Sequence, residues 1–139
     1  DVTEGAPGNH ERQAFVFDRN KVRFRNLVGE VTLPAEDLIA GRQFARTPYF
    51  ASFQAGWFRF TLMSVHVRFG SDSSADRALR AAEIGALSRR VAARAQEERE
   101  VYVMIGDMNI VARDDEIMRA LTDHGLTVPY FGPTNRVHR

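Results

Sequence analysis

The sequence of 139 residues predicts a layered α/β domain, in which helices flank a mixed and mostly antiparallel sheet. Three observations lead to this fold class. Several short segments rich in aromatic and branched residues indicate strands, and all of them precede the first helical pattern. A long segment with apolar residues at helical spacing comes next. A continuous apolar run follows that helix directly, as expected for a buried strand.

The first elements in the chain are expected to be strands joined by turns. Residues 13–18 predict a strand, and the pair Arg19-Asn20 predicts a two-residue turn into another strand over 21–24. Residues 28–33 alternate in polarity and predict a further strand. Residues 34–47, bounded by prolines, indicate a loop.

A second hairpin and a long helix are expected after this loop. Residues 49–53 and 58–67 flank Ala55-Gly56, and the length of the second arm places it centrally in the sheet. Ser73 and Asp76 have the spacing of a capping box, which predicts a helix that runs to about Arg99. The apolar face of this helix would consist of Ile84, Leu87, Val91 and Ala95.

The last elements are a strand and a short helix. Residues 101–105 predict the buried strand, and 106–109 its exit loop. Acidic residues at 114–116 favour the start of a helix that contains Ile117 and Leu121 and that Gly125 would end; the remainder from Pro129 indicates loop. No repeat or internal domain boundary is visible, so residues 1–139 are expected to form a single domain.

Composition narrows the classes of site that the chain can hold. An apolar content of 44% suits a soluble domain with a core, and no stretch approaches the roughly 20 apolar residues of a membrane span. The absence of cysteine excludes disulfides and thiolate metal sites, and it leaves the cytoplasm and export equally open. Any metal would need oxygen or imidazole ligands, which favours a hard ion such as magnesium or calcium.

Charge is distributed unevenly, although the net charge is only +1. Between Leu38 and Ser71 there is no acidic residue, but there are four arginines and one histidine: Arg42, Arg46, Arg59, His66 and Arg68. Such a stretch is suited to an anionic ligand, and it is equally compatible with a solvated face that acids elsewhere balance.

The segment Gly106-Asp107-Met108-Asn109 is the first candidate site. It follows a buried strand, and ligands of α/β sheets bind at the carboxyl ends of strands. In an extended chain Asp107 and Asn109 would point the same way, with Met108 turned into the core. A carboxylate can hold a metal or orient water, and an amide can bind a phosphate oxygen. The alternative is ordinary turn chemistry, because Gly, Asp and Asn all favour turns.

Three other residues are weaker candidates. His66, near the end of the long strand, is either a general acid or base or a buried histidine satisfied by one hydrogen bond. Glu11, before the first expected strand, is either a surface acid or the partner of a histidine. Arg46, before Thr47-Pro48, is either a phosphate clamp or a loop arginine.

Taken together, four segments resemble the endonuclease/exonuclease/phosphatase superfamily, which includes deoxyribonuclease I. Residues 11–17, followed by Asn20-Lys21-Val22, resemble its strand with the pattern E-R-x-x-F, and Arg46-Thr47-Pro48 resembles its R-x-P strand entry. Residues 60–67 resemble its strand ending in a histidine, and residues 103–109 its G-D-(F/M)-N motif. The four segments occur in the family's order, with a helix between the last two.

This resemblance implies a fold and a reaction. The fold would be part of the four-layer β-sandwich of deoxyribonuclease I. The reaction would be in-line attack of water on a phosphodiester or phosphomonoester, assisted by Mg²⁺ (or Mn²⁺ or Ca²⁺). The leading interpretation is a nuclease that acts on DNA or RNA. His66 would be the general acid or base with Glu11 as its carboxylate partner, and Asp107 would activate water or hold the metal. Phosphate oxygens would be bound by Asn109 and Arg46, and by Thr134 or Asn135 in a weaker match.

The chain departs from the family pattern at both ends. Members begin with a strand, a helix and a strand that carry an asparagine and the principal metal-binding glutamate, and they end with an aspartate after a tyrosine and then an Asp-His pair. Neither part has a counterpart here. We therefore expect the chain to correspond to the central portion of the domain, to be weak or inactive alone, and to self-associate through exposed sheet edges and a core face.

Three further interpretations stay open at this point. The chain could be a non-catalytic fragment or module that binds an anionic partner, or a phosphatase or sphingomyelinase-type member of the same superfamily. An unrelated α/β domain with coincidental motifs is the third. Geometry separates these alternatives, because only the superfamily interpretation requires His66, Asp107, Asn109 and Glu11 to meet in one place.

Overall fold

A computed structural model of the chain describes residues 13–112 and 115–130. Its elements follow one another in the order expected from the sequence, strands first and then helix, strand and helix. They are β1 (Arg23–Glu30), a 3-10 helix η1 (Ala35–Asp37), β2 (Tyr49–Ala55), β3 (Phe58–His66), α1 (Ser74–Glu98), β4 (Val101–Asp107) and α2 (Glu116–Thr122).

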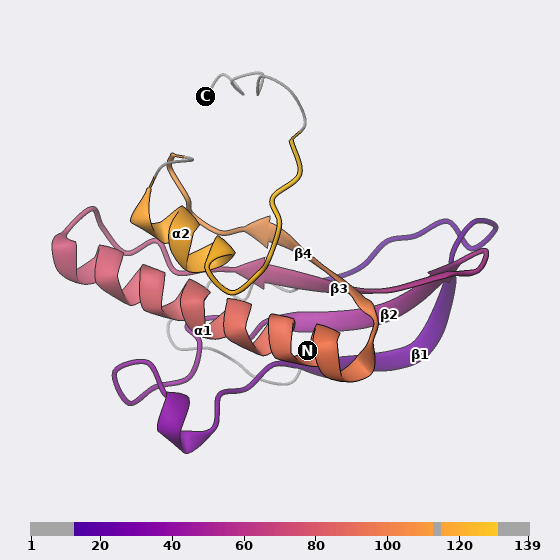
Figure 1. Ribbon diagram of the computed structural model, residues 1–139, viewed down its shortest axis with the longest axis horizontal. Helices are drawn as coiled ribbons and strands as arrows, with labels where there is room; N and C mark the ends of the chain where they lie inside the picture. Colours follow the sequence, from indigo (N-terminus) through magenta and orange to yellow (C-terminus); the bar gives the residue numbers. More distant parts are fainter. Residues whose placement is uncertain (1–12, 113–114, 131–139) are drawn as a thin grey trace.

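The four strands form one mixed sheet in the order β1-β2-β3-β4 (Figure 1). The pairs β1–β2 and β2–β3 are antiparallel, while β3 and β4 are parallel and are joined through α1. This is the mixed, mostly antiparallel sheet with flanking helices that the sequence predicts. Within the part of the chain that the structure describes, β1 and β4 are the two outer strands.

The core lies between one face of the sheet and α1, which crosses that face (Figure 1). Phe50 of β2 and Met63 and Val65 of β3 point to this side and pack with Leu87 and Val91 of α1. Each such side chain, fully buried, contributes about 1.5–3 kcal/mol to folding. The second helix, α2, extends the core, since its Ile117 and Leu121 pack with Ile84 of α1.

Both ends of α1 lie where the sequence places them. The Ser73 hydroxyl accepts a hydrogen bond from the Asp76 backbone N–H at 3.1 Å, which satisfies one of the free donors of the first turn. Arg99 follows Glu98 in the left-handed conformation, with φ of 51°, and ends the helix.

The strand expected over residues 13–18 is absent. These residues pair with no strand, and the rings of Phe15 and Phe17 lie instead against Phe53, with centroid distances of 5.8 and 5.1 Å. Val16 between them is 99% exposed. The alternation of aromatic residues that indicated a strand therefore arises from packing across a sheet face and not from strand pairing.

The strands expected over 21–24 and 28–33 are one irregular strand. The turn at residues 19–21 is present, but β1 then runs from Arg23 to Glu30, with a shift in its pairing to β2 between Phe24 and Val28. Asn26 has φ of 58° inside this irregular stretch. Between these two pairs β1 advances four residues and β2 only two. The two extra residues interrupt the regular alternation of side chains, which explains why the sequence pattern divides there.

The sheet face away from α1 keeps an apolar surface exposed. Val101, Val103 and Ile105 of β4 lie on this face and are each more than a third exposed. The strand is therefore present, but the expectation that it is buried is wrong, because β4 is an outer strand of the described sheet. Self-association through this face or through the outer strands stays a prediction. No helix among the described residues is both long and apolar enough to cross a membrane.

Candidate active site

Strand directions bring three of the predicted residues to one end of the sheet. β3 ends at His66 and β4 ends at Asp107, and the parallel pairing sets these two residues directly opposite each other. β2 runs the other way, so that Tyr49 at its start pairs with Ser64 of β3. Arg46, three residues before β2, therefore enters the sheet at the same end.

His66 and Asp107 lie on the same face of the sheet. Side chains alternate along a strand, and Met63 and Val65 of β3 are buried toward α1. His66 therefore belongs to the face away from α1, as does its register partner Asp107. His66 is half-buried and Asp107 is exposed. The histidine thus lies at the sheet's end beside a carboxylate, and not in the apolar core.

Asn109 is placed differently from the extended geometry assumed in the sequence analysis. It has φ of 51°, its backbone N–H donates to an Asp107 carboxylate oxygen at 2.9 Å, and its side-chain amide donates to the Val67 carbonyl at 2.7 Å. Met108 packs against the core as expected. The result is a tight turn that joins the ends of β3 and β4 and keeps Asp107 and Asn109 adjacent.

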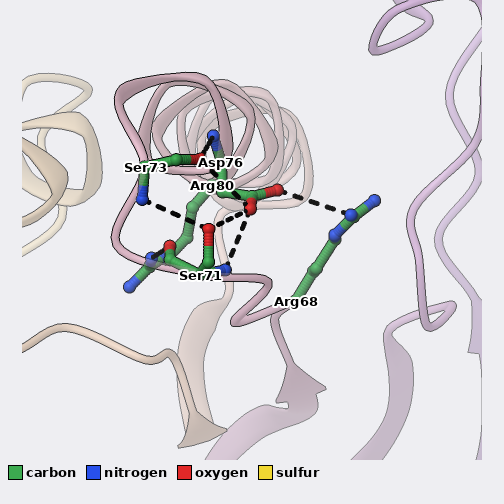
Figure 2. Close-up of polar contacts among 5 residues, drawn as sticks. All are labelled: Arg68, Ser71, Ser73, Asp76 and Arg80. Atoms are coloured by element: carbon green, nitrogen blue, oxygen red, sulfur yellow. Dashed lines mark hydrogen bonds and ion pairs between the residues drawn. The ribbon is translucent and has the colours of Figure 1, made fainter.

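Arg80 of α1 is a buried residue that the sequence analysis did not select (Figure 2). Its side chain is 1% exposed, and its guanidinium lies 4.7 Å from the centroid of the Phe69 ring. One terminal nitrogen donates to the Asn109 carbonyl and the other to the Ser71 carbonyl, each at 3.0 Å. A single side chain thereby joins the loop after β3 to the loop after β4.

Asp76 holds the other side of the loop after β3 (Figure 2). One of its carboxylate oxygens accepts hydrogen bonds from the Ser71 backbone N–H at 3.0 Å and from the Ser71 hydroxyl at 2.6 Å. The bond from the Ser71 hydroxyl lowers the pKa of Asp76. An ion pair of 3.4 Å with Arg68 adds to this network. The loop between His66 and α1 is therefore fixed by side chains from the first two turns of the helix.

Glu83, one turn after Arg80, fixes the loop that carries Arg46. Its carboxylate accepts a hydrogen bond from the Ala45 N–H at 3.3 Å. Burial raises the pKa of Glu83, while backbone hydrogen bonds from Ala45 and Arg68 and the charges of Arg68 and Arg46 act in the opposite direction. The buried acid thus lies beside Arg46 and ties its loop to the same helix that holds the other two loops.

The Glu83→Gln variant is expected to flatten the dependence of stability on pH. A carboxyl whose pKa is raised in the folded state binds more protons in the folded than in the unfolded chain. Its contribution to the free energy of unfolding is therefore complete below the ordinary pKa of about 4.5, and it is lost as pH rises through the raised pKa. Glutamine retains an oxygen for the Ala45 N–H and does not titrate. Urea unfolding gives the free energy of unfolding at pH 5 and at pH 8. The decrease in this free energy from pH 5 to pH 8 should be smaller for the variant than for the parent chain.

Glu97→Gln is the matched control for this measurement, because Glu97 is exposed on the same helix. It should leave the difference in unfolding free energy between the two pH values as in the parent chain. If Glu83→Gln also left that difference unchanged, the Glu83 carboxyl would not be perturbed by its surroundings.

A signal for Arg80 and Glu83 is present in the sequence. Arg80 precedes Ile84 by four residues and Leu87 by seven, so it continues the apolar face of the helix toward its start. Glu83 precedes Leu87 by four residues. Charged residues on the buried face of an amphipathic helix need partners, which identifies them as candidates for a polar network.

Asp107 is the only described residue that the sequence analysis predicts as a metal ligand. No group of three or more acidic or histidine side chains that could hold an ion occurs among residues 13–112 and 115–130. A single carboxylate suits an ion such as Mg²⁺, which keeps several waters and is held by one or two carboxylates together with phosphate oxygens. The other predicted site residues, Glu11, Thr134 and Asn135, lie outside the described residues.

Comparisons with known proteins identify structural neighbours. No family model and no curated protein sequence matches the chain. Among solved structures, the human Nocturnin catalytic domain with a bound sulfate anion is similar over 74% of this chain, with 14% identity and a TM-score of 0.51. A humanized D. rerio TDP2 is similar over 73%, with 15% identity and a TM-score of 0.45.

Both neighbours are members of the endonuclease/exonuclease/phosphatase superfamily. The chain spans about a third of their length, 36% in each case. The similarity to the Nocturnin catalytic domain, with a TM-score above 0.5, shows the fold. The described sheet and helices therefore have a deoxyribonuclease I-like fold, shared with part of the Nocturnin catalytic domain.

Proposed function

We propose that the protein is a metal-dependent phosphodiester hydrolase of the nuclease type, acting on DNA or RNA. The observation that supports this most directly is the parallel register of β3 and β4, which sets His66 opposite Asp107 at the carboxyl ends of both strands. Asn109 and Arg46 belong to loops at the same end. The sulfate held by the Nocturnin catalytic domain adds that a domain of this fold accepts a tetrahedral oxyanion.

Each residue has a role suited to its chemistry. In the reaction a water oxygen attacks phosphorus, the bond from phosphorus to the leaving oxygen breaks, the water loses a proton and the leaving oxygen gains one. His66 would move one of these protons, because imidazole both accepts and donates near neutral pH. Asp107 would orient the attacking water. Arg46 and the Asn109 amide would bind phosphate oxygens.

Residues outside the described part complete the proposal by resemblance. Glu11 would be the carboxylate that orients His66, and Thr134 or Asn135 would contact phosphate. Asp107, within the described part, would also help to hold Mg²⁺, or Mn²⁺ or Ca²⁺. When bound, the ion would neutralise charge that develops on the phosphate oxygens.

Hydrolysis of bis(p-nitrophenyl) phosphate and of DNA, with Mg²⁺ or Mn²⁺ present, tests this function. The chain should be assayed alone and within a longer chain extended at both ends, and we expect the longer one to be the more active. His66→Ala and Asp107→Asn should each lower the rate by roughly 10²- to 10⁴-fold, the usual contribution of an acid or base. Unfolding transitions should be unchanged, because neither side chain is in the buried core.

His124→Ala is the matched control, since His124 lies after α2 and outside the proposed site. It should retain the activity of the parent. If the folded, extended protein hydrolysed neither substrate, the proposal would fail and an anion-binding module would become the better interpretation. If it were active but insensitive to both His66→Ala and Asp107→Asn, the catalytic site would lie elsewhere.

A further inference from the structure

A second polar region lies at the other end of the sheet, where the β2–β3 hairpin turns (Figure 1). Arg23 of β1 and Arg59 of β3 each pair in register with Gln54 of β2, so that the three side chains form a row across neighbouring strands. A terminal nitrogen of Arg23 donates to the Gln54 side-chain oxygen at 2.9 Å, and the Gln54 amide donates to the Gly56 carbonyl at 2.8 Å. Gln54 thus anchors Arg23 to the hairpin.

Two adjoining hollows open over this row, of about 330 and 310 Å³, and they share Arg23 and Gln54. We refer to them together as the hairpin groove. The irregular part of β1 turns Arg25 toward it, and the turn before β1 contributes Arg19 and Lys21. The cationic residues that line the hairpin groove are Arg19, Lys21, Arg23, Arg25 and Arg59.

Among the described residues, the cations of the hairpin groove have a single ion-pair partner. Arg25 forms an ion pair with Glu100. Among the residues that the structure describes, no carboxylate makes an ion pair with Arg19, Lys21, Arg23 or Arg59. Four exposed cations around a shared hollow repel one another, and an anion with several negative groups relieves this repulsion. Arginine also provides a fork of donors that matches phosphate oxygens.

An exposed aromatic residue stands beside the hairpin groove. Trp57, the only tryptophan, is 94% exposed at the tip of the hairpin, between Gly56, which lines the groove, and Phe58, which is 49% exposed. Covering an exposed ring of this size with a ligand is favourable, because its apolar surface is then removed from water. Cations combined with an exposed aromatic face are the arrangement that binds single strands, whose phosphates contact the cations while a base stacks on the ring.

We propose that the hairpin groove and Trp57 form a binding surface for single-stranded nucleic acid, separate from the hydrolytic site. Arg23, Arg59 and Lys21 bind successive phosphates, and Trp57 stacks on an unpaired base. Arg59 and His66 are seven residues apart on β3, which separates the two regions by about 23 Å at roughly 3.3 Å per residue. A mononucleotide therefore cannot contact both, whereas a polymer can. The binding surface does not depend on the hydrolytic function proposed above.

Fluorescence of Trp57 provides a direct test, because no other tryptophan contributes to the signal. The full chain is titrated with single-stranded oligodeoxythymidylate in EDTA, at two salt concentrations. Binding should quench the emission, and affinity should fall as salt rises, since phosphate contacts release counterions. Arg23→Gln and Arg59→Gln should each weaken binding and reduce the slope of log affinity against log salt by about 0.7.

A labelled oligonucleotide, followed by anisotropy, measures the contribution of the ring itself. Trp57→Leu should weaken binding by roughly tenfold to a hundredfold, the range for the loss of one stacked base. Arg89→Gln, which removes an exposed charge from α1, is the matched control and should bind as the parent does.

Three results would overturn the proposal. The first is unchanged Trp57 emission at saturating single-stranded oligonucleotide. The second is equal affinity of the parent and of the Arg23→Gln and Arg59→Gln variants. The third is tighter binding of duplex than of single-stranded DNA, without quenching of Trp57 by the duplex. Because EDTA prevents metal-dependent cleavage, binding can be present in a protein that lacks hydrolytic activity, and absent in one that has it.

Discussion

The Gly106→Ala variant is expected to lower the free energy of unfolding by roughly 3 kcal/mol or more, through backbone strain and a close contact. Gly106 has φ of 135°, a conformation open almost only to glycine. A Cβ atom here would also overlap the carbonyl oxygen of Val65, its register partner on β3. Neither group can move without separating the parallel strands, so the substitution would weaken the pairing of β3 and β4.

Urea unfolding of the purified chain measures this loss, and Gly125→Ala is its matched control. Gly125 also has positive φ, 89°, but a Cβ there would meet no atom within 4 Å. The control should therefore lose only the roughly 1–2 kcal/mol of a left-handed residue with a side chain. Equal losses in the two variants would show that the approach of Gly106 to Val65 does not limit stability.

This expectation gives a physical reason for the glycine of the Gly106-Asp107-Met108-Asn109 segment. The sequence alone suggests a turn glycine, but Gly106 lies in β4 and is paired with β3. The absence of a side chain lets the two strands remain paired up to His66 and Asp107. A displaced Gly106 would shift Asp107 away from His66, so the glycine is needed for the site as well as for the fold.

The elements that the sequence predicts well are those specified by local pattern. The hairpin of β2 and β3, the capped helix α1 and the apolar strand β4 each depend on neighbours within a few residues. Residues 13–18 show the limit of this approach. A segment with alternating Phe15 and Phe17 looks the same whether its rings pack beside a strand partner or across a sheet face, and only the position of Phe53 decides between them.

The candidate site also has features that the sequence predicts and features that it does not. That His66 and Asp107 meet follows from a strand-helix-strand unit, because its two strands are parallel and their carboxyl ends coincide. The conformation of Asn109 does not follow, since its φ of 51° is set by a hydrogen bond to Val67, 42 residues earlier in the chain. Likewise, Arg80 resembles any other helix arginine until both of its acceptor carbonyls are known.

Replacement of Arg80 by leucine should cost roughly 2–5 kcal/mol of unfolding free energy. The carbonyls of Ser71 and Asn109 would lose their buried donor, and each unsatisfied group costs about 1–3 kcal/mol. Arg80→Lys keeps the charge but has a single ammonium in place of a planar fork, so it should recover only part of this loss. Arg89→Leu on the same helix, at an exposed position, should change stability by less than about 0.5 kcal/mol.

Amide hydrogen exchange can distinguish loss of stability from loss of the connection that Arg80 makes. The guanidinium holds the loop after β3 through Ser71 and the loop after β4 through Asn109. In Arg80→Leu, residues 70–73 and 107–111 should therefore lose protection together, and by more than the centre of β3 does. Faster exchange in one loop alone would mean that the loops are held independently. Joint loss would establish that a residue of α1 sets the relative position of the two segments that carry His66 and Asp107.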